Sequence, residues 1–306
     1  MELLYVLEKL RVPGLNEFMI LITHLGEETA FLAVALILFW CVDKRRGYYV
    51  MAVGFIGTIF NQFLKLLCRV PRPWVLDENF TILEGARAGA AGYSFPSGHS
   101  QTAVGTFGAI ACTTERKWVR GVCVAIAVLV PFSRMYAGVH TPSDVLTGTV
   151  LALAFVLILK PMAFRDNPRG MKDVLGGMLF LSAAFLAVVE RYPFRENVDP
   201  QNLQAGWKNA YALLGSIAGI CVVYPVERRY ICFDTKAVWW VQIIKCVLGL
   251  ALVLLVKSCL RAPLEGILPV YPARAVRYFL VVLTAGLLWP LTFRFFAELG
   301  EKNELR

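Results

Sequence analysis

Long apolar runs separated by short polar connectors are the feature that most constrains how this chain folds. Residues of the set AVILMFWYC fill 58% of its 306 positions and charged residues only 17%, whereas soluble domains carry about 25% charged residues. A water-soluble globule cannot bury that much apolar surface, so the sequence predicts an all-α polytopic membrane bundle of about nine transmembrane helices. The expected spans are Glu17–Val42, Gly47–Leu67, His99–Thr114, Val119–Arg134, Ser143–Leu159, Val174–Val189, Asn209–Tyr224, Ala237–Val256 and Ala275–Phe296.

The segment before the first span has a different pattern. Leu3, Leu7 and Leu10 recur at helical spacing with charged residues between them. This spacing predicts an amphipathic helix over residues 1–14 that lies on the membrane surface, with a plain packing helix as the alternative. The cleanly apolar part of the first span, Thr29–Val42, is short, so we expect that helix to begin near Glu17.

The basic residues sit mainly in the connectors. The formal net charge of +9 therefore indicates membrane topology rather than nucleic-acid binding. Alternate connectors, such as Lys44–Arg46 and Arg228–Lys236, carry more Lys and Arg than the others, which places the N-terminus outside and the C-terminus in the cytoplasm. The plasma membrane is the default location. The loop from Trp74 to Phe95 then lies outside, and its length suggests a lid or binding loop.

Three polar segments lie at the outer ends of expected spans. They are Lys65–Pro73, Ser94–Ser100 and Ser133–Asp144. The order in which the spans cross the membrane brings all three segments to one face. The eight cysteines form no CxxC pair and most lie in apolar runs, so we expect neither a metal site nor a disulfide framework.

The residue types in these segments suit phosphate binding. Lys65, Arg72 and Arg134 supply cationic donors, and a guanidinium can bind phosphate oxygens through two hydrogen bonds. Ser97 and Gly98 stand where a helix begins, so a hydroxyl and backbone N–H groups can face an anion there. Together they predict a phosphate cradle.

Two histidines remain for bond making and breaking. If a helix begins at Pro142, Asp144 can orient the His140 imidazole four residues before it, as in nucleophile–base–carboxylate triads. His99 can then protonate the leaving oxygen. The pattern predicts phosphoryl transfer through paired imidazoles.

The three segments resemble the signature of the type 2 phosphatidic acid phosphatase (PAP2) superfamily: K-x6-R-P, P-S-G-H and S-R-x5-H-x3-D. The resemblance implies that His140 is the nucleophile forming a phosphohistidine, Asp144 its orienting partner and His99 the proton donor. It implies a lipid phosphate or prenyl diphosphate substrate among membrane lipids, and no metal or other cofactor. The soluble vanadium haloperoxidase branch does not fit a membrane composition. The implied phosphate-binding residues are Lys65, Arg72, Ser97, Gly98 and Arg134.

The resemblance also divides the chain. We expect an interfacial helix at 1–14, a PAP2-like catalytic helical core at 15–160 and a C-terminal membrane helical extension at 161–306. The extension could complete the bundle, form a homodimer contact or wall a lipid entry groove. Lys245 inside it is either functional or buried against a partner, and His24 with Glu27 and Glu28 could border the pocket.

Two other functions stay open at this stage. A lipid phosphotransferase would use the same histidine chemistry with an alcohol in place of water as acceptor. A non-enzymatic lipid transporter could share the fold, although it would not need His99, His140 and Asp144 together.

Overall fold

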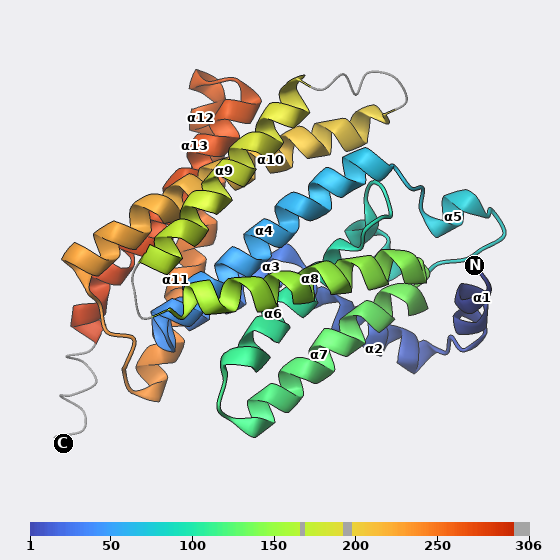
Figure 1. The fold of residues 1–306 in the computed structure, drawn as a ribbon, viewed down its shortest axis with the longest axis horizontal. Helices are drawn as coiled ribbons and strands as arrows, with labels where there is room; N and C mark the ends of the chain where they lie inside the picture. The colour runs from blue at the N-terminus through green and yellow to red at the C-terminus, as the bar shows by residue number, and fades with distance from the viewer. Residues whose placement is uncertain (166–168, 192–197, 297–306) are drawn as a thin grey trace. The chain divides into compact units, whose positions relative to one another are not determined.

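The computed structural model describes residues 1–165, 169–191 and 198–296. Over these ranges the regular elements are all helical, which confirms the expected all-α class (Figure 1). The α-helices are α1 (Glu2–Lys9), α2 (Pro13–His24), α3 (Glu28–Cys41), α4 (Lys44–Cys68), α5 (Pro73–Leu76), α6 (Gly98–Thr113), α7 (Lys117–Tyr136), α8 (Pro142–Ala163), α9 (Arg169–Arg191), α10 (Pro200–Val226), α11 (Trp239–Cys259), α12 (Arg261–Ile267) and α13 (Val270–Leu283).

The number of candidate spans is slightly smaller than the nine expected. Within the described ranges, seven helical stretches are long and apolar enough to cross a membrane, and the bent pair α2–α3 would make eight. The expected span at His99–Thr114 corresponds to α6, which has 16 residues. At 1.5 Å per residue it is about 24 Å long, shorter than a hydrocarbon core of roughly 30 Å.

The first expected span is broken rather than continuous. The chain bends by 54° between α2 and α3, so a single helix from Glu17 to Val42 was the wrong expectation. The bend places Gly26 against α6 and α7, because a Cβ there would lie 2.7 Å from Val130 Cγ1 and 2.9 Å from the His99 carbonyl oxygen. The close approach explains why the break carries glycine.

The described helices form two compact units. The first comprises the described residues of Met1–Val34, Tyr49–Met162 and Pro193–Gly206. In it, α6 and α7 pack through Ala103, Phe107, Ala111, Cys123 and Val130. Small residues let α4 and α8 approach α6 as well: a Cβ on Gly105 would lie 3.2 Å from Val53 and 3.9 Å from Ala152.

The N-terminal helix belongs to this first unit. Helix α1 buries Leu4 and Leu7, whereas Leu3 and Leu10 are exposed. Its Tyr5 hydroxyl donates to Asp77 at 2.6 Å, so the helix contacts the loop that follows α5. An additional position at the membrane surface stays a prediction, as does the three-part division at residues 14 and 160.

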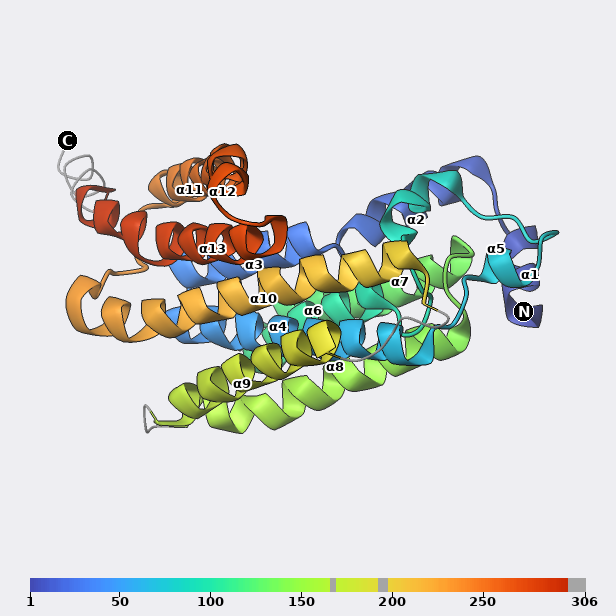
Figure 2. The same cartoon turned by 90° about the horizontal axis from the view of Figure 1, so that it is seen from above.

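The second unit comprises the described residues of Ala35–Tyr48, Ala163–Tyr192 and Trp207–Arg306. Helices α11, α12 and α13 lie together within it (Figure 2). Lys245 of α11 is buried, and its ammonium donates to the Trp40 carbonyl at 3.2 Å and lies 4.1 Å from the Phe293 ring centroid. Of the two roles open to Lys245, the structure shows burial against partners.

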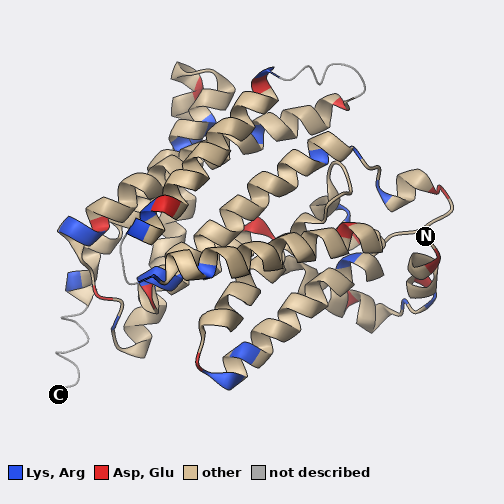
Figure 3. Cartoon of the chain, viewed as in Figure 1, with Lys and Arg blue, Asp and Glu red and all other residues tan. Residues whose placement is uncertain are grey.

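The charge pattern used for topology is visible in the helices. Basic residues gather at helix ends and the helix middles are mostly uncharged (Figure 3). The C-terminal residues 297–306, whose Lys302 and Arg306 contribute to the predicted cytoplasmic end, lie outside the described residues.

Candidate active site

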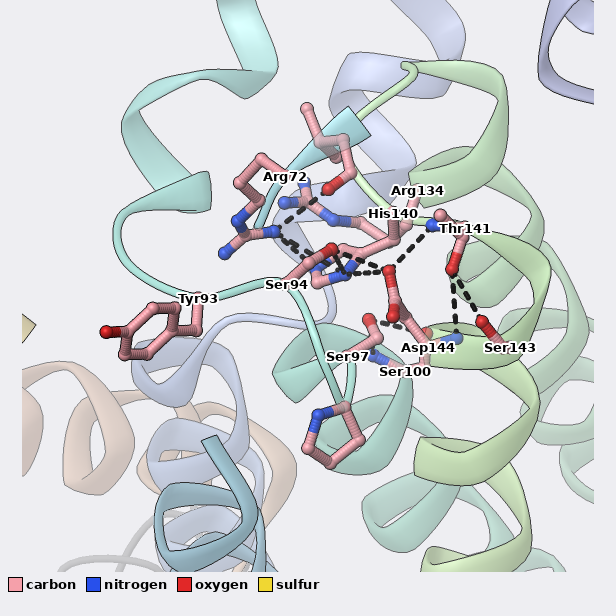
Figure 4. A network of polar contacts seen from close by, with 12 residues as sticks. Arg72, Tyr93, Ser94, Ser97, Ser100, Arg134, His140, Thr141, Ser143 and Asp144 are labelled. Carbon is pink, nitrogen blue, oxygen red and sulfur yellow. Dashed lines mark hydrogen bonds and ion pairs between the residues drawn. The ribbon is translucent and has the colours of Figure 1, made fainter. Parts of the chain in front are cut away.

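The three predicted segments meet within the first unit (Figure 4). The Ser97 N–H donates to the Asp144 carbonyl oxygen at 3.0 Å and joins the start of α6 to the start of α8. Gly148 keeps this approach close, because a Cβ there would lie 2.6 Å from the Ser97 carbonyl oxygen. The loop from Trp74 to Phe95 is held against the end of α7, because the Leu83 N–H donates to the Ala137 carbonyl at 3.0 Å.

His140 lies at the centre of the cluster and is 1% exposed. Its Nε2 is 2.9 Å from Arg72 Nη1. A guanidinium only donates hydrogen bonds, so Nε2 accepts and the imidazole proton resides on Nδ1. Nδ1 lies farther from that Nη1, at 3.4 Å, and has two oxygens that can accept its proton, Ser94 Oγ at 3.4 Å and Asp144 Oδ2 at 3.5 Å. The contacts therefore select the tautomer whose Nε2 carries the lone pair.

Asp144 is held in place by the start of α8. Its Oδ2 accepts from the Thr141 N–H at 2.7 Å, and the Thr141 hydroxyl accepts from the Asp144 N–H at 3.3 Å. This reciprocal pairing is a capping box, and α8 begins at Pro142 as expected. The cap thus aims the carboxylate back toward His140.

Burial, followed by the nearby Arg72 and Arg134 charges, holds the pKa of His140 well below the usual histidine value of about 6.5. Lys65 and His99 act in the same direction, so all four groups disfavour a positive charge on this imidazole. At neutral pH His140 is therefore uncharged, the form that a nitrogen nucleophile needs.

A histidine NMR titration tests this electrostatic arrangement. With three histidines in the chain, His24→Gln and His99→Gln variants assign the ring signals. We expect the His140 signal to keep neutral-imidazole shifts down through pH 6.5. Below about pH 6.5 the unfolded chain takes up a proton at His140 and the folded chain does not. The free energy of unfolding therefore decreases as the pH is lowered through this range. A His140 midpoint at or above 6.5 would contradict the arrangement.

Arg72 binds the loop as well as the imidazole. Its Nε donates to the Gly92 carbonyl at 2.8 Å, and Nη2 donates to that of Ala91 at 3.1 Å. Nη1 also donates to the Val139 carbonyl at 2.9 Å. The guanidinium is nearly buried, so it joins the long loop to the segment that carries His140.

Arg134 projects from α7 and is fully buried. Nη1 donates to Thr23 Oγ1 at 2.8 Å and Nη2 to the Gly89 carbonyl at 3.3 Å. Its Nε has no hydrogen-bond partner among the described residues. One N–H of this guanidinium therefore remains able to donate to a bound anion.

His99 is the second residue of α6. Gly26 contacts its backbone, and a Cβ on Gly89 would lie 3.2 Å from its Nε2. That Nε2 is buried, and no residue that the structure describes hydrogen-bonds to it. Since Gly89 also accepts from Arg134, one loop residue contacts both side chains.

The other predicted cradle residues serve mainly local structure. Lys65 donates to the Tyr93 carbonyl at 2.6 Å. Ser97 caps α6, with its hydroxyl accepting from Ser100 Oγ at 2.9 Å. Gly98 begins α6, and a Cβ there would make only an ordinary contact with Asn61. Phosphate binding by Lys65, Ser97 and Gly98 stays a prediction.

Ser94 is a residue that sequence reasoning missed. It is fully buried and donates to Asp144 Oδ2 at 2.6 Å. Figure 4 shows it beside His140 and Asp144. Thr23, the acceptor for Arg134, was missed too. A polar residue just before the P-S-G-H motif was the signal available for Ser94, whereas nothing in the sequence pairs Thr23 with Arg134.

The residues predicted to border the pocket lie next to Thr23. His24 and Glu27 form a pair at 2.6 Å, and Glu28 is exposed. Over the described ranges, no three His, Cys, Asp or Glu side chains form a candidate metal site. Independence from metals stays a prediction.

Comparison with known proteins gives matches to one family. The PAP2 superfamily profile matches residues 46–168, and a profile for the transmembrane extension of PAP2 superfamily phosphatases matches residues 211–302. Phosphatidylglycerophosphatase B of Bacillus subtilis is 32% identical over 164 residues, covering 49% of this chain and 76% of that protein. An undecaprenyl-diphosphatase of Sulfolobus acidocaldarius is 29% identical over 151 residues, covering 49% and 71%.

One solved structure is also similar. The crystal structure of a transmembrane PAP2 type phosphatidylglycerolphosphate phosphatase from Bacillus subtilis covers 54% of this chain and 84% of its own. The sequence identity is 29% and the TM-score 0.46. The contact network around His140 lies inside the range matched by the first profile.

Proposed function

This chain belongs to the PAP2 superfamily of membrane phosphatases, and from that premise we propose that it hydrolyses the phosphate ester or terminal diphosphate of a lipid through a phosphohistidine on His140. The observation that carries the proposal is the state of that imidazole: buried, neutral, with the lone pair on Nε2 and the proton on Nδ1 toward Asp144. Arg72 contacts this imidazole and Arg134 adds positive charge near it, an arrangement that suits a histidine receiving a phosphoryl group.

In the first step, His140 Nε2 forms a bond to phosphorus and the bond from phosphorus to the leaving oxygen breaks. The Arg72 donor now on Nε2 passes to a phosphate oxygen as phosphorus arrives. Arg134 Nε stabilises the charge that develops on the other oxygens. Protonated His99, stabilised by the phosphate dianion, gives its proton to the leaving oxygen.

In the second step, water attacks phosphorus and the phosphorus–nitrogen bond breaks. His99, now neutral, accepts the water proton, and the electron pair returns to His140 Nε2. Asp144 stabilises the positive charge that the imidazole carries while it is phosphorylated. The cations and backbone donors provide the charge stabilisation, so the mechanism that we propose needs no metal.

The charge pattern of the connectors supports a location for this chemistry. The three catalytic segments join spans on the side poorer in Lys and Arg, which favours the non-cytoplasmic face of the plasma membrane. The lipid tail would remain among the helices while its headgroup reaches His140. Cysteine accessibility in sealed vesicles, read at single positions of the Trp74–Phe95 loop, tests this orientation.

A phosphate-release panel tests the function. The purified full chain is offered phosphatidate, phosphatidylglycerophosphate, sphingosine phosphate and prenyl diphosphates, with glucose 6-phosphate as the soluble control. We expect release from at least one lipid and little from the sugar phosphate. Product analysis with added alcohols separates hydrolysis from transfer. Failure of every lipid would contradict the proposal.

Ser94→Ala tests the positioning of the carboxylate. Losing the hydroxyl that donates to Asp144 Oδ2 leaves the nucleophile in place but lets the carboxylate reorient. A hydrogen bond to a charged group stabilises by about 1.5–3 kcal/mol, so we expect kcat to fall about tenfold to a hundredfold with KM nearly unchanged. Ser94→Thr, which keeps the hydroxyl, is the matched control. A change confined to KM would assign Ser94 to substrate binding.

A further inference from the structure

The second unit contains a cavity of about 390 Å³, and none of its lining residues belongs to the candidate active site. Ligand pockets are usually about 300–1,000 Å³, so this volume suits a small headgroup. Figure 3 shows basic residues where α4 and α9 begin and where α10 ends. The polar lining includes Lys44, Arg45, Tyr48, Arg165, Glu227 and Arg228.

Two buried oxygens of this lining lack partners. Glu227 is fully buried, and its Oε1 accepts from Lys44 Nζ at 2.6 Å. Its Oε2 and the hydroxyl of Tyr48, which is 4% exposed, have no hydrogen-bond partner within the described part of the chain. An unpaired buried polar group costs about 1–3 kcal/mol. A ligand that donates a hydrogen bond to each oxygen would remove this cost.

The cavity is also lined by positively charged side chains. Lys44 is paired with Glu227, which leaves the three guanidiniums of Arg45, Arg165 and Arg228 as excess positive charge. Arg228 Nη1 donates to the Tyr224 hydroxyl at 2.7 Å, which orients that guanidinium and leaves further N–H groups on it. Guanidiniums bind phosphate oxygens through paired, charge-assisted hydrogen bonds.

The backbone at the end of α10 brings the two kinds of group together. Residues Glu227–Ile231 form a π-helical turn, and Cys232 follows it with φ of 44°. Single π turns are frequent at functional sites. Here the turn presents a carboxylate and a guanidinium from adjacent residues to one cavity.

We propose that this cavity binds a phosphodiester headgroup that carries a hydroxyl or ammonium donor beyond its phosphate. The arginines hold the phosphate, and Glu227 Oε2 with the Tyr48 hydroxyl meets the donor. The basic residues of the lining belong to connectors that the charge pattern assigns to the cytoplasm, so a phospholipid of that leaflet is the source we favour over a soluble phosphate ester. The site is independent of the hydrolysis proposed above.

The test measures binding to the purified full chain in phosphatidylcholine nanodiscs, because choline has no N–H or O–H to donate. One arm adds phosphatidylglycerol to the discs and the other adds soluble glycerol 3-phosphate. The readouts are lipids retained in native mass spectrometry and the rise in melting temperature with ligand. Arg229→Gln is the matched control for Arg228→Gln, because Arg229 lies in the same turn over the Tyr230 ring and is absent from the lining.

We expect phosphatidylglycerol to be retained by the parent and by Arg229→Gln, and its apparent affinity to fall about tenfold in Arg228→Gln. Tyr48→Phe, which removes only an unpartnered hydroxyl, should fold and weaken binding about threefold. A response confined to the glycerol 3-phosphate arm, lost in Arg228→Gln, supports the phosphate site with a soluble ligand. The proposal would be overturned by an equal loss of affinity in Arg228→Gln and Arg229→Gln, by no binding in either arm, or by unchanged binding in Tyr48→Phe.

Discussion

His140→Ala should abolish the release of phosphate from lipid substrates, with kcat lower by about 10⁴-fold or more. The substitution removes the atom that bonds to phosphorus, the Nε2 that lies 2.9 Å from Arg72 Nη1. The measurement is inorganic phosphate released by the purified variant in detergent.

His24→Ala is the matched control, because it removes the exposed histidine that pairs with Glu27. We expect that variant to keep activity within a few-fold of the parent. A thermal transition near that of the parent shows that His140→Ala is folded. Phosphate release at the parental rate by a folded His140→Ala would rule out this nucleophile.

His99→Gln should produce the second-largest loss, and the loss should depend on the leaving group. A general acid contributes about 10²–10⁴-fold when the leaving oxygen is a basic alkoxide. We therefore expect a loss of that size with a lipid alkyl phosphate. With para-nitrophenyl phosphate, whose weakly basic phenolate leaves without a proton, the loss should be much smaller.

The ratio of the two rates is the informative quantity. If His99 only held the start of α6, both substrates would slow equally in His99→Gln. Arg134 contacts the same loop residue, Gly89. We expect Arg134→Lys to slow both substrates alike, since it weakens charge stabilisation without removing a proton donor.

Much of the site could be predicted because its chemistry lies in short segments. The spacing from His140 to Asp144 matters only if a helix begins between them, and Pro142 supplies that start. The charge and hydropathy of the runs likewise sufficed for a membrane bundle. These features depend on residues that are near each other in the sequence.

The features that the sequence did not predict depend on packing between distant segments. The break between α2 and α3 follows from the close approach of Gly26 to α6 and α7, which no hydropathy pattern contains. Thr23 and Ser94 are ordinary polar residues until Arg134 and Asp144 lie against them. For the same reason Lys245 could not be assigned before Trp40 and Phe293 were placed beside it.

The most direct test of the central claim is to trap the covalent enzyme. The chain is mixed with a ³²P-labelled lipid phosphate, quenched within milliseconds in alkaline denaturant and digested for mass spectrometry. We predict label on the peptide containing His140, stable to base, lost in acid and absent from His140→Ala. Label on a different residue, or turnover of substrate with no labelled protein at any sampled time, would contradict the phosphohistidine mechanism.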